Sequence, residues 1–340
     1  MNFDSMSILT IWTAIAIYAA AFIAYALDLG RRSQVASDAK FGTGEVAERE
    51  LVGAAAGGSA SALGSQRGGS RASTAGTGSG AVASPQRFVM ARIGTALATL
   101  GFLFHLAGEV LRGIAAGRVP WSNMYEFAMT GTLLIIAVYL AVNIWFDLKF
   151  LGTFILGLVV VLLGAAATGF YVQVVPLSDP LKSVWLVIHV FVASLGTAFF
   201  ALAFALSAFQ LLQHRRQAKV LAGAEKTGPR FLATLPSSER LEGLAYRFAT
   251  IGFIFWTFTL IAGAIWANDA WGRYWGFDTK ETWTFIIWVL YAGYIHARAT
   301  RGWRGSRSAW LAIVGFSAVL FNFTIVNMFF KGLHVYSGLS

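Results

Sequence analysis

The sequence predicts an all-α polytopic membrane protein with about eight transmembrane helices and an external tryptophan-rich loop. Its 340 residues are 57% hydrophobic and only 12% charged, whereas a soluble domain has about 25% charged residues. Apolar runs long enough to cross a bilayer recur along the chain, and none alternates as the strands of an outer-membrane barrel do. These observations exclude an ordinary soluble enzyme.

Eight apolar runs account for the predicted helices, since ~20 helical residues cross about 30 Å of hydrocarbon. They cover roughly residues 7–27, 88–111, 123–146, 150–172, 184–212, 247–267, 281–297 and 308–331. The first run is too long for a cleaved signal peptide and lacks its basic start and small-residue exit. We therefore expect residues 1–27 to be a retained N-terminal transmembrane anchor.

Residues 28–87 are predicted to form an insert between the first two helices. Its middle, from Gly53 to Ser84, consists almost entirely of Gly, Ala, Ser and Thr with a few Arg. Such a segment buries too little apolar surface to offset its ordering entropy, so we expect the insert to be largely disordered. Residues 88–340 would then form a seven-helix membrane domain.

The positions of the basic residues predict the orientation. With eight crossings, 20 of the 26 Lys and Arg fall in the segments on one side, which the positive-inside rule assigns to the cytoplasm. The insert is then cytoplasmic and both termini are outside. The net charge of +10 is mostly this signature, and we expect no nucleic-acid partner.

Tryptophan is concentrated in one part of the chain, where six of the twelve lie between positions 256 and 288. Residues 266–283 read WANDAWGRYWGFDTKETW and include a predicted external loop. One interpretation is an aromatic belt at the level of the lipid headgroups. The other starts from Gly272 and Gly276, each of which follows a tryptophan and lets the backbone approach a ligand closely. Several large flat faces suit a flat, mostly apolar ligand with a polar edge.

Asp278 and Glu281 have the spacing of a capping box at the start of the seventh helix. Acidic residues at this end of a helix also interact favourably with the helix dipole. We expect Asp278 to cap that helix. This role does not exclude a second one in the loop.

Two of the five histidines are predicted to lie on the same side as this loop. His189 is near the outer end of the fifth helix, four residues after Trp185 and so on the same helix face. His334 follows the eighth helix, which also exits outside. Each alone is more often an ordinary polar residue, but two neutral imidazoles at a wall of aromatic rings are what bis-His ligation of haem iron requires.

The remaining histidines have other interpretations. His296 lies near the inner end of the seventh helix, as either an interfacial residue favoured by the helix dipole or a ligand in the inner half of the membrane. His105 has Glu109 at i+4, and we expect the two to satisfy each other in a structural pair. His214, in a basic segment, is expected to be solvated.

The chain has no cysteine, which excludes structural disulfides, thiolate metal sites and thiol redox relays within it. No residue is an evident acid–base catalyst, and we assign no catalytic residue.

The segment WGRYWGFDTKETW resembles the tryptophan-rich "WWD" signature of haem-handling proteins in cytochrome c maturation. The surrounding arrangement is similar to the CcsA (ResC-like) family, a subunit of the System II cytochrome c synthase. Further segments resemble parts of that family: PWSNMYE (120–126), WLVIHV, HARATRGWRG and GLHVYSG. The likeness runs from about position 88 to the end. It departs from the family pattern at Arg273-Tyr274 and Phe277, where tryptophan is frequent, and at Gly117-Arg118, where some relatives have Gly-His.

The resemblance implies that the protein binds haem b, delivers it to the outer face of the membrane and presents it for thioether attachment to CxxCH apocytochromes c. It would do so within a holocytochrome c synthase (haem lyase) complex that works by ligation and positioning. His189 and His334 resemble the two external axial ligands of the iron, and His296 resembles one ligand of an intramembrane haem site. The implied haem platform consists of Trp271, Gly272, Trp275, Gly276, Phe277, Asp278, Lys280 and Glu281.

The same resemblance implies three partners. A CcsB (ResB-like) membrane protein would supply the other intramembrane ligand, an apocytochrome c with a CxxCH motif would be the substrate, and thioredoxin-like thiol reductants would keep its cysteines reduced. The implied location is the bacterial cytoplasmic membrane, or the thylakoid membrane in a plastid.

Three alternatives remain open on the sequence. A System I relative would load a haem chaperone instead. A membrane transporter with an aromatic gate would purify colourless. An electron-transferring b-type cytochrome would need two ligands within the membrane for each haem, which the sequence offers poorly.

Overall fold

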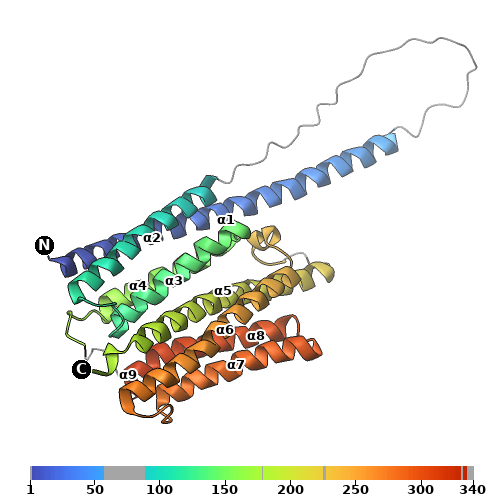
Figure 1. Cartoon of the computed structure of the whole chain (residues 1–340). Coiled ribbons are helices and arrows are strands. Elements are labelled where there is room, and N and C mark those ends of the chain that lie inside the picture. The colour runs from blue at the N-terminus through green and yellow to red at the C-terminus, as the bar shows by residue number, and fades with distance from the viewer. Residues whose placement is uncertain (1, 57–88, 178, 225–226, 331, 335–340) are drawn as a thin grey trace, which may run out of the picture.

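The protein is a bundle of long helices (Figure 1). The computed structural model describes residues 2–56, 89–177, 179–224, 227–330 and 332–334, and all regular structure in these ranges is helical. The long helices are α1 (Phe3–Ala56), α2 (Val89–Ala116), α3 (Met124–Trp145), α4 (Gly152–Gly169), α5 (Val184–Leu221), α6 (Ser238–Trp271), α7 (Thr279–Arg301) and α8 (Ser306–Phe321). Shorter elements are the 3-10 turns η1 (Lys149–Leu151), η2 (Asp179–Lys182) and η3 (Arg230–Thr234), the π-helix η4 (Asn322–Val326) and α9 (Asn327–Phe329). The predicted all-α membrane fold is confirmed.

Within the described ranges, seven helices are long and apolar enough to cross a membrane. The exception among the long helices is α7, which has Lys280 and Glu281 in its first turn and His296 and Arg298 near its end. Its lower apolar content reflects these polar residues and not a shorter length, since it has 23 residues.

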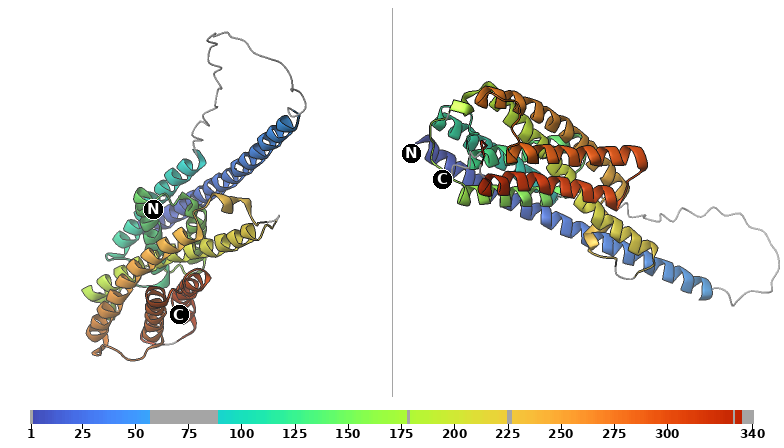
Figure 2. Two further views of the ribbon diagram at one scale, coloured as in Figure 1. Left: turned by 90° about the vertical axis from the view of Figure 1, so that its right-hand side faces the viewer. Right: turned by 90° about the horizontal axis from the view of Figure 1, so that it is seen from below.

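Helix α7 nevertheless runs the full height of the bundle. At its start, Lys280 Nζ donates to Asn327 Oδ1 beyond α8 (2.5 Å). At its other end, Arg298 Nε donates to Glu242 Oε1 near the start of α6 (3.2 Å). The start of α1 and the end of α8 lie at the same end of the bundle as the start of α7 (Figures 1 and 2). We call this the site end, because the candidate site described below lies there. An even number of passes between the two ends follows, as eight predicted crossings require.

Helix α1 is longer than predicted, because the charged residues after position 27 do not end it. Asp28 accepts from Arg32 Nε one turn later (2.6 Å) and from the backbone N–H of Ala91 in α2 (3.1 Å). Paired in this way, the charges support further helix, and α1 continues to Ala56 beyond the rest of the bundle (Figure 1). Of the predicted insert, residues 28–56 are therefore helical and 57–88 lie outside the described residues.

Helices α5 and α6 approach closely through small residues. A Cβ on Gly196 of α5 would lie 3.3 Å from the carbonyl oxygen of Gly252 on α6, and one on Gly252 would lie 3.2 Å from Gly196 O. Glycines that let two backbones meet are typical of helix packing in membranes. This glycine pair allows the close packing of α5 and α6. The two helices carry much of the candidate site.

A buried ionic network joins the first three helices at the site end. Arg112 of α2 and Glu126 of α3 have fully buried side chains and pair at 3.0 Å. Arg112 also pairs with Asp4 of α1 (2.6 Å), and Arg118 of the α2–α3 loop pairs with Glu126 (2.8 Å). Breaking a buried pair of this kind by removing one partner costs about 3–5 kcal/mol.

The predicted pair of His105 and Glu109 is wrong. His105 Nδ1 lies 3.4 Å from the hydroxyl of Tyr18 on α1, and Glu109 Oε1 accepts from the hydroxyl of Thr130 on α3. Each side chain therefore has its hydrogen-bond partner on a neighbouring helix and not in the other residue of the predicted pair. Both residues are buried and tie α2 to its neighbours.

Candidate functional site

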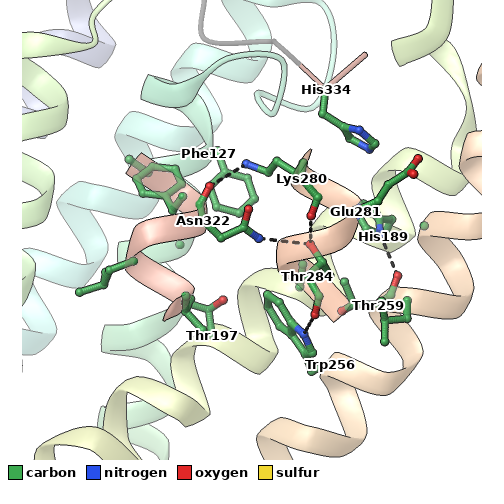
Figure 3. A pocket seen from close by; sticks show the side chains of 18 of the residues that line it. Phe127, His189, Thr197, Trp256, Thr259, Lys280, Glu281, Thr284, Asn322 and His334 are labelled. Atoms are coloured by element: carbon green, nitrogen blue, oxygen red, sulfur yellow. Dashed lines mark hydrogen bonds between the residues drawn. The ribbon is translucent and has the colours of Figure 1, made fainter. Parts of the chain in front are cut away.

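A cavity lies at the site end between α3, α5, α6, α7 and α8 (Figure 3). The cavity has a volume of about 160 Å³ and is open at its mouth, and the empty space is about 1170 Å³ when the solvent at the mouth is included. The residues that define its chemistry are Phe127, Thr132, His189, Trp256, Thr259, Tyr274, Trp275, Lys280, Glu281, Asn322 and His334.

His189 enters the cavity from α5 with a fixed ring. Its Nδ1 donates to the carbonyl oxygen of Thr259 on α6 at 3.0 Å (Figure 3), and its ring stacks on Trp266 with centroids 5.8 Å apart and planes 19° apart. A carbonyl partner on Nδ1 assigns the proton to that nitrogen and leaves the lone pair on Nε2. Histidine ligands of metals are commonly oriented in this way.

His334 reaches the same cavity from the segment after α9. Its ring meets Trp271 and Trp266 edge to face, with centroids 4.7 Å and 5.3 Å apart. Its Nδ1 lies 3.5 Å from Oδ1 of Asp278, whose other oxygen accepts from the backbone N–H of Leu333 (2.7 Å). The loop thereby holds the C-terminal segment against the aromatic wall.

Asp278 is nearly buried, with a side chain 5% exposed. Burial alone would raise the pKa of its carboxyl group, but the nearby imidazole of His334 and the hydrogen bonds from the backbone N–H groups of Lys280 and Leu333 outweigh burial and hold that pKa below its usual range. The carboxylate therefore stays ionised and able to accept at neutral pH.

Trp266 connects the two histidines and is a site residue that the sequence interpretation did not single out. It lies on the last turns of α6, is 2% exposed, and contacts the rings of His189, His334 and Trp271. Its place in the tryptophan-rich segment was visible in the sequence. Its contact with both histidines depends on how α5 and the C-terminal segment pack on α6.

The loop between α6 and α7 is tightly folded. Gly272 ends α6 in the left-handed region, with φ of 69°. The guanidinium group of Arg273 occupies the space beside Gly276 where a side chain would project. Glu281 accepts from the backbone N–H groups of Gly276 (2.8 Å) and Asp278 (3.1 Å). With the bond from Lys280 N to Asp278 Oδ1 (2.8 Å), this arrangement confirms the predicted capping box.

Phe277 has a backbone conformation that favours glycine, with φ of 57°, and its side chain is 82% exposed. A left-handed conformation costs a non-glycine residue roughly 1–2 kcal/mol. The loop thus holds a large aromatic ring outward at an energetic cost, next to Trp275 with ring centroids 6.1 Å apart.

Lys280 connects the cavity to the π-helix η4. Its Nζ donates to Asn327 Oδ1 (2.5 Å) and to the carbonyl oxygen of Asn322 (3.4 Å), while Asn322 Nδ2 donates to Thr284 Oγ1 (3.2 Å; Figure 3). Short π-helical segments often occur at functional sites. This one turns Asn322 toward the start of α7.

The structure brings most of the predicted site residues together. His189, His334, Trp275, Lys280 and Glu281 line the cavity. Trp271 and Asp278 contact His334 and so lie beside the cavity. Gly272, Gly276 and Phe277 belong to the α6–α7 loop but do not line the cavity. His296 is separate, exposed on α7 near the opposite end of the bundle.

A family model described as "Cytochrome C assembly protein" matches residues 121–334. That range is more than half of the chain and contains every residue of the site. The chain belongs to the cytochrome c assembly protein family. The resemblance predicted from the tryptophan-rich loop is therefore confirmed, and the family places the chain in cytochrome c maturation.

Relatives within this family are named cytochrome c biogenesis protein CcsA. The one from Guillardia theta is 37% identical over 243 residues, which cover 67% of this chain and 80% of the relative. The one from Synechococcus sp. (strain CC9605) is 34% identical over 279 residues, covering 75% and 89%.

Among solved structures, the chain is similar to the cytochrome c heme lyase CcmF, with a TM-score of 0.58 at 15% identity. The match covers 95% of this chain and 47% of CcmF, so the chain spans about half of that protein's length. At this identity the likeness shows a shared fold alone.

Proposed function

We propose that this protein holds haem between His189 and His334 and presents it for attachment to CxxCH apocytochromes c. The observation that carries the proposal is that both imidazoles line one cavity and both contact Trp266. Two histidines that approach one space from different parts of the chain can fill the two axial positions of one iron.

The chemistry of the donors supports haem as the substrate. The Thr259 carbonyl holds the His189 ring and leaves its Nε2 lone pair for a metal. The Nδ1 of His334 lies 3.5 Å from Asp278 Oδ1, so Nε2 is the nitrogen that this ring would offer to a metal. The walls are mostly apolar and aromatic, with Trp256 and Trp275 among them. Such walls suit a large flat ligand.

Thioether formation needs orientation more than acid–base catalysis. Each thiol of the apocytochrome adds across one vinyl double bond, with the sulfur bonding to one carbon and the hydrogen to the other, so no oxidant is consumed. The chain has no cysteine, so both thiols come from the substrate. The contribution of this protein is ligation and positioning, which is the usual role of a protein around such a group.

His296 supports a role for a second membrane protein. An exposed ionisable residue in a membrane helix is costly unless a partner covers it, and we propose that a CcsB-like protein does so and completes an intramembrane haem site. Thioredoxin-like proteins would keep the substrate cysteines reduced.

The proposed orientation places the site end outside the cytoplasm, in a bacterial cytoplasmic membrane or a thylakoid membrane. The positive-inside count supports this orientation. The CcsA relative from the Synechococcus strain is consistent with either membrane.

The test is the absorption spectrum of the purified complex together with the yield of mature cytochrome c. We expect a bis-His spectrum that is lost in His189→Ala and His334→Ala, with maturation sharply reduced and added imidazole restoring part of it. His214→Ala, at an exposed position, is the matched control. The proposal would be contradicted, and a transporter favoured, if the native protein purified colourless and both histidine variants, present at normal level, left maturation unchanged.

A further inference from the structure

The cavity of the proposed haem site contains one fixed positive charge. Among the described residues that line it, Lys280 is the only lysine or arginine. The side chain starts in the first turn of α7, and its ammonium group points toward Asn322 of η4 and away from the imidazoles of His189 and His334 (Figure 3). The proposed iron ligands and this cation therefore occupy different parts of one cavity.

Two acceptors hold the ammonium group in place. They are Asn327 Oδ1 at 2.5 Å and the carbonyl oxygen of Asn322 at 3.4 Å. Asn327 is itself oriented, because its Nδ2 donates to the carbonyl oxygen of Phe323 one turn earlier (2.8 Å). An ammonium group has three N–H donors, and the described residues accept from two of them. Lys280 is thus preorganised and has a donor left for a ligand.

No carboxylate among the described residues forms an ion pair with Lys280, and the two acidic residues nearest to it in sequence are engaged elsewhere. Asp278 accepts from the backbone N–H groups of Lys280 and Leu333. Glu281 pairs with Arg273 (3.4 Å) and accepts from two backbone N–H groups of the loop. An ammonium group without a counter-ion is costly in a mostly apolar cavity. It calls for an anionic group on the molecule that fills the cavity.

The surroundings favour an anion that is carried on an apolar body. Phe127 of α3 and Phe323 of η4 both line the cavity and stack on each other, with centroids 5.3 Å and planes 26° apart. Opposite charges attract more strongly beside such walls than in water, because the local dielectric constant is lower.

Haem satisfies the histidines and the lysine together. Its iron would take the two imidazoles, and its two propionates extend from one edge of the macrocycle, to one side of the axial ligands. A phospholipid would offer a phosphate to Lys280 but nothing to the Nε2 lone pair of His189. The placement of the cation away from both imidazoles therefore favours haem.

We infer that Lys280 pairs with a propionate of haem and so determines which edge of the macrocycle is presented for attachment. The two vinyl groups lie on the edge opposite the propionates, so an ion pair beside η4 leaves the vinyl edge facing away from η4. This inference rests on the proposed function, because it assigns a further binding residue within the proposed haem site. It makes the free propionates part of what the site recognises.

The test compares haem with haem dimethyl ester, in which both propionates are neutral. Each is titrated into the complex of the full chain with its membrane partner, with His296→Ala present so that only the haem held by His189 and His334 contributes to the bis-His absorption. We expect this parent complex to bind haem about tenfold more tightly than the ester, equivalent to ~1.4 kcal/mol.

Lys280→Met, added to the parent complex, should remove the preference for haem and keep the bis-His spectrum. Comparing the two complexes cancels any general effect of esterification on binding. Lys182→Met is the matched control, because this lysine is also at the site end, pairs with Asp179 (2.7 Å) and does not line the cavity. It should keep the tenfold preference.

Equal affinity of the parent complex for haem and its ester overturns the inference and leaves the proposed function standing. This comparison needs no change at Lys280, so it decides the question even if Lys280→Met does not fold. A Lys280→Met complex that keeps the preference also overturns the inference, and loss of a co-purified phospholipid from that complex would assign Lys280 to a lipid phosphate. If neither compound gives a bis-His spectrum, the proposed function fails and the inference fails with it.

Discussion

The imidazole of His189 occupies the space that a side chain at Gly263 would need. A Cβ on Gly263 would lie 2.7 Å from His189 Cε1 and 2.8 Å from its Nδ1. The ring is held there because Nδ1 donates to the carbonyl oxygen of Thr259, one turn earlier on α6. Helix α6 therefore supplies both the room and the hydrogen bond that orient the proposed ligand.

Gly263→Ala should displace the His189 ring and weaken haem binding. Loss of the support behind a histidine ligand typically lowers metal affinity ~10–100-fold, and we expect a reduction in this range, measured by haem titration of the purified complex. Gly293→Ala on α7 is the control, because no atom lies within 4 Å of a Cβ there. Native haem affinity in Gly263→Ala would contradict the assigned role of His189.

Trp266→Phe should disturb both axial positions at once, because the indole contacts both histidines. We expect reduced haem content that imidazole does not restore, in contrast to His189→Ala. Trp266→Ala would be less informative, since truncating a buried tryptophan destabilises by about 3–5 kcal/mol. Trp310→Phe, at a residue 52% exposed, is the matched control, and rescue of Trp266→Phe by imidazole would argue against a shared wall.

Asp278→Ser separates the two roles of this carboxylate. Serine still caps α7 but has no second oxygen for Leu333 N–H, so the segment that carries His334 should lose its anchor. We expect a haem spectrum like that of His334→Ala with a normal melting temperature. Asp278→Ala should in addition lose about 1 kcal/mol of stability. An unchanged spectrum in Asp278→Ser would show that the aromatic contacts alone position His334.

The contact between the Asp278 carboxylate and the Leu333 N–H should weaken only at low pH. The pKa of Asp278 is held below its usual range, so the stabilisation that it provides is present above the ordinary aspartate pKa and is lost as pH falls through the lowered value. This contact should therefore be insensitive to pH near neutrality.

The positions of the helices were predictable because each apolar run must cross the same hydrocarbon thickness. The end of α1 was not, because the charges at Asp28 and Arg32 look like a helix end until their mutual pairing and the contact with α2 are known. His105 and Glu109 were misassigned for a related reason, since a sequence shows i+4 neighbours but not the helices packed on either side.

For the site, the sequence placed His189, His334 and the loop on one side but not in contact. The contact depends on Gly263 and Trp266 of α6, which both meet His189 only because of the way α5 packs on α6. Lys280 illustrates the same limit. Its partner Asn322 lies in the π-helix η4 and its partner Asn327 begins α9, and no apolar pattern in the sequence signals this change of helix type.

The proposed orientation can be tested with reporter fusions. Ala222, which ends α5, and Asn268, on the last turn of α6, lie at opposite ends of the bundle. An alkaline phosphatase reporter should be active at Asn268 and inactive at Ala222, because the excess of basic residues marks the cytoplasmic side. The reverse pattern would put the proposed haem site in the cytoplasm, and activity at both positions would contradict the eight predicted crossings.

The last prediction is that this chain needs a partner protein to complete the proposed intramembrane haem site. His296 is exposed on α7, and no described residue donates to or accepts from its ring. A histidine there is costly against lipid, but a partner helix would cover it and place a second ligand opposite. In the complex with a CcsB-like protein, His296→Ala should lose the intramembrane haem and keep the haem held by His189 and His334, with His214→Ala as control. Conversion of a CxxCH apocytochrome at full rate by the single chain, given haem and reductant, would show that no partner is required.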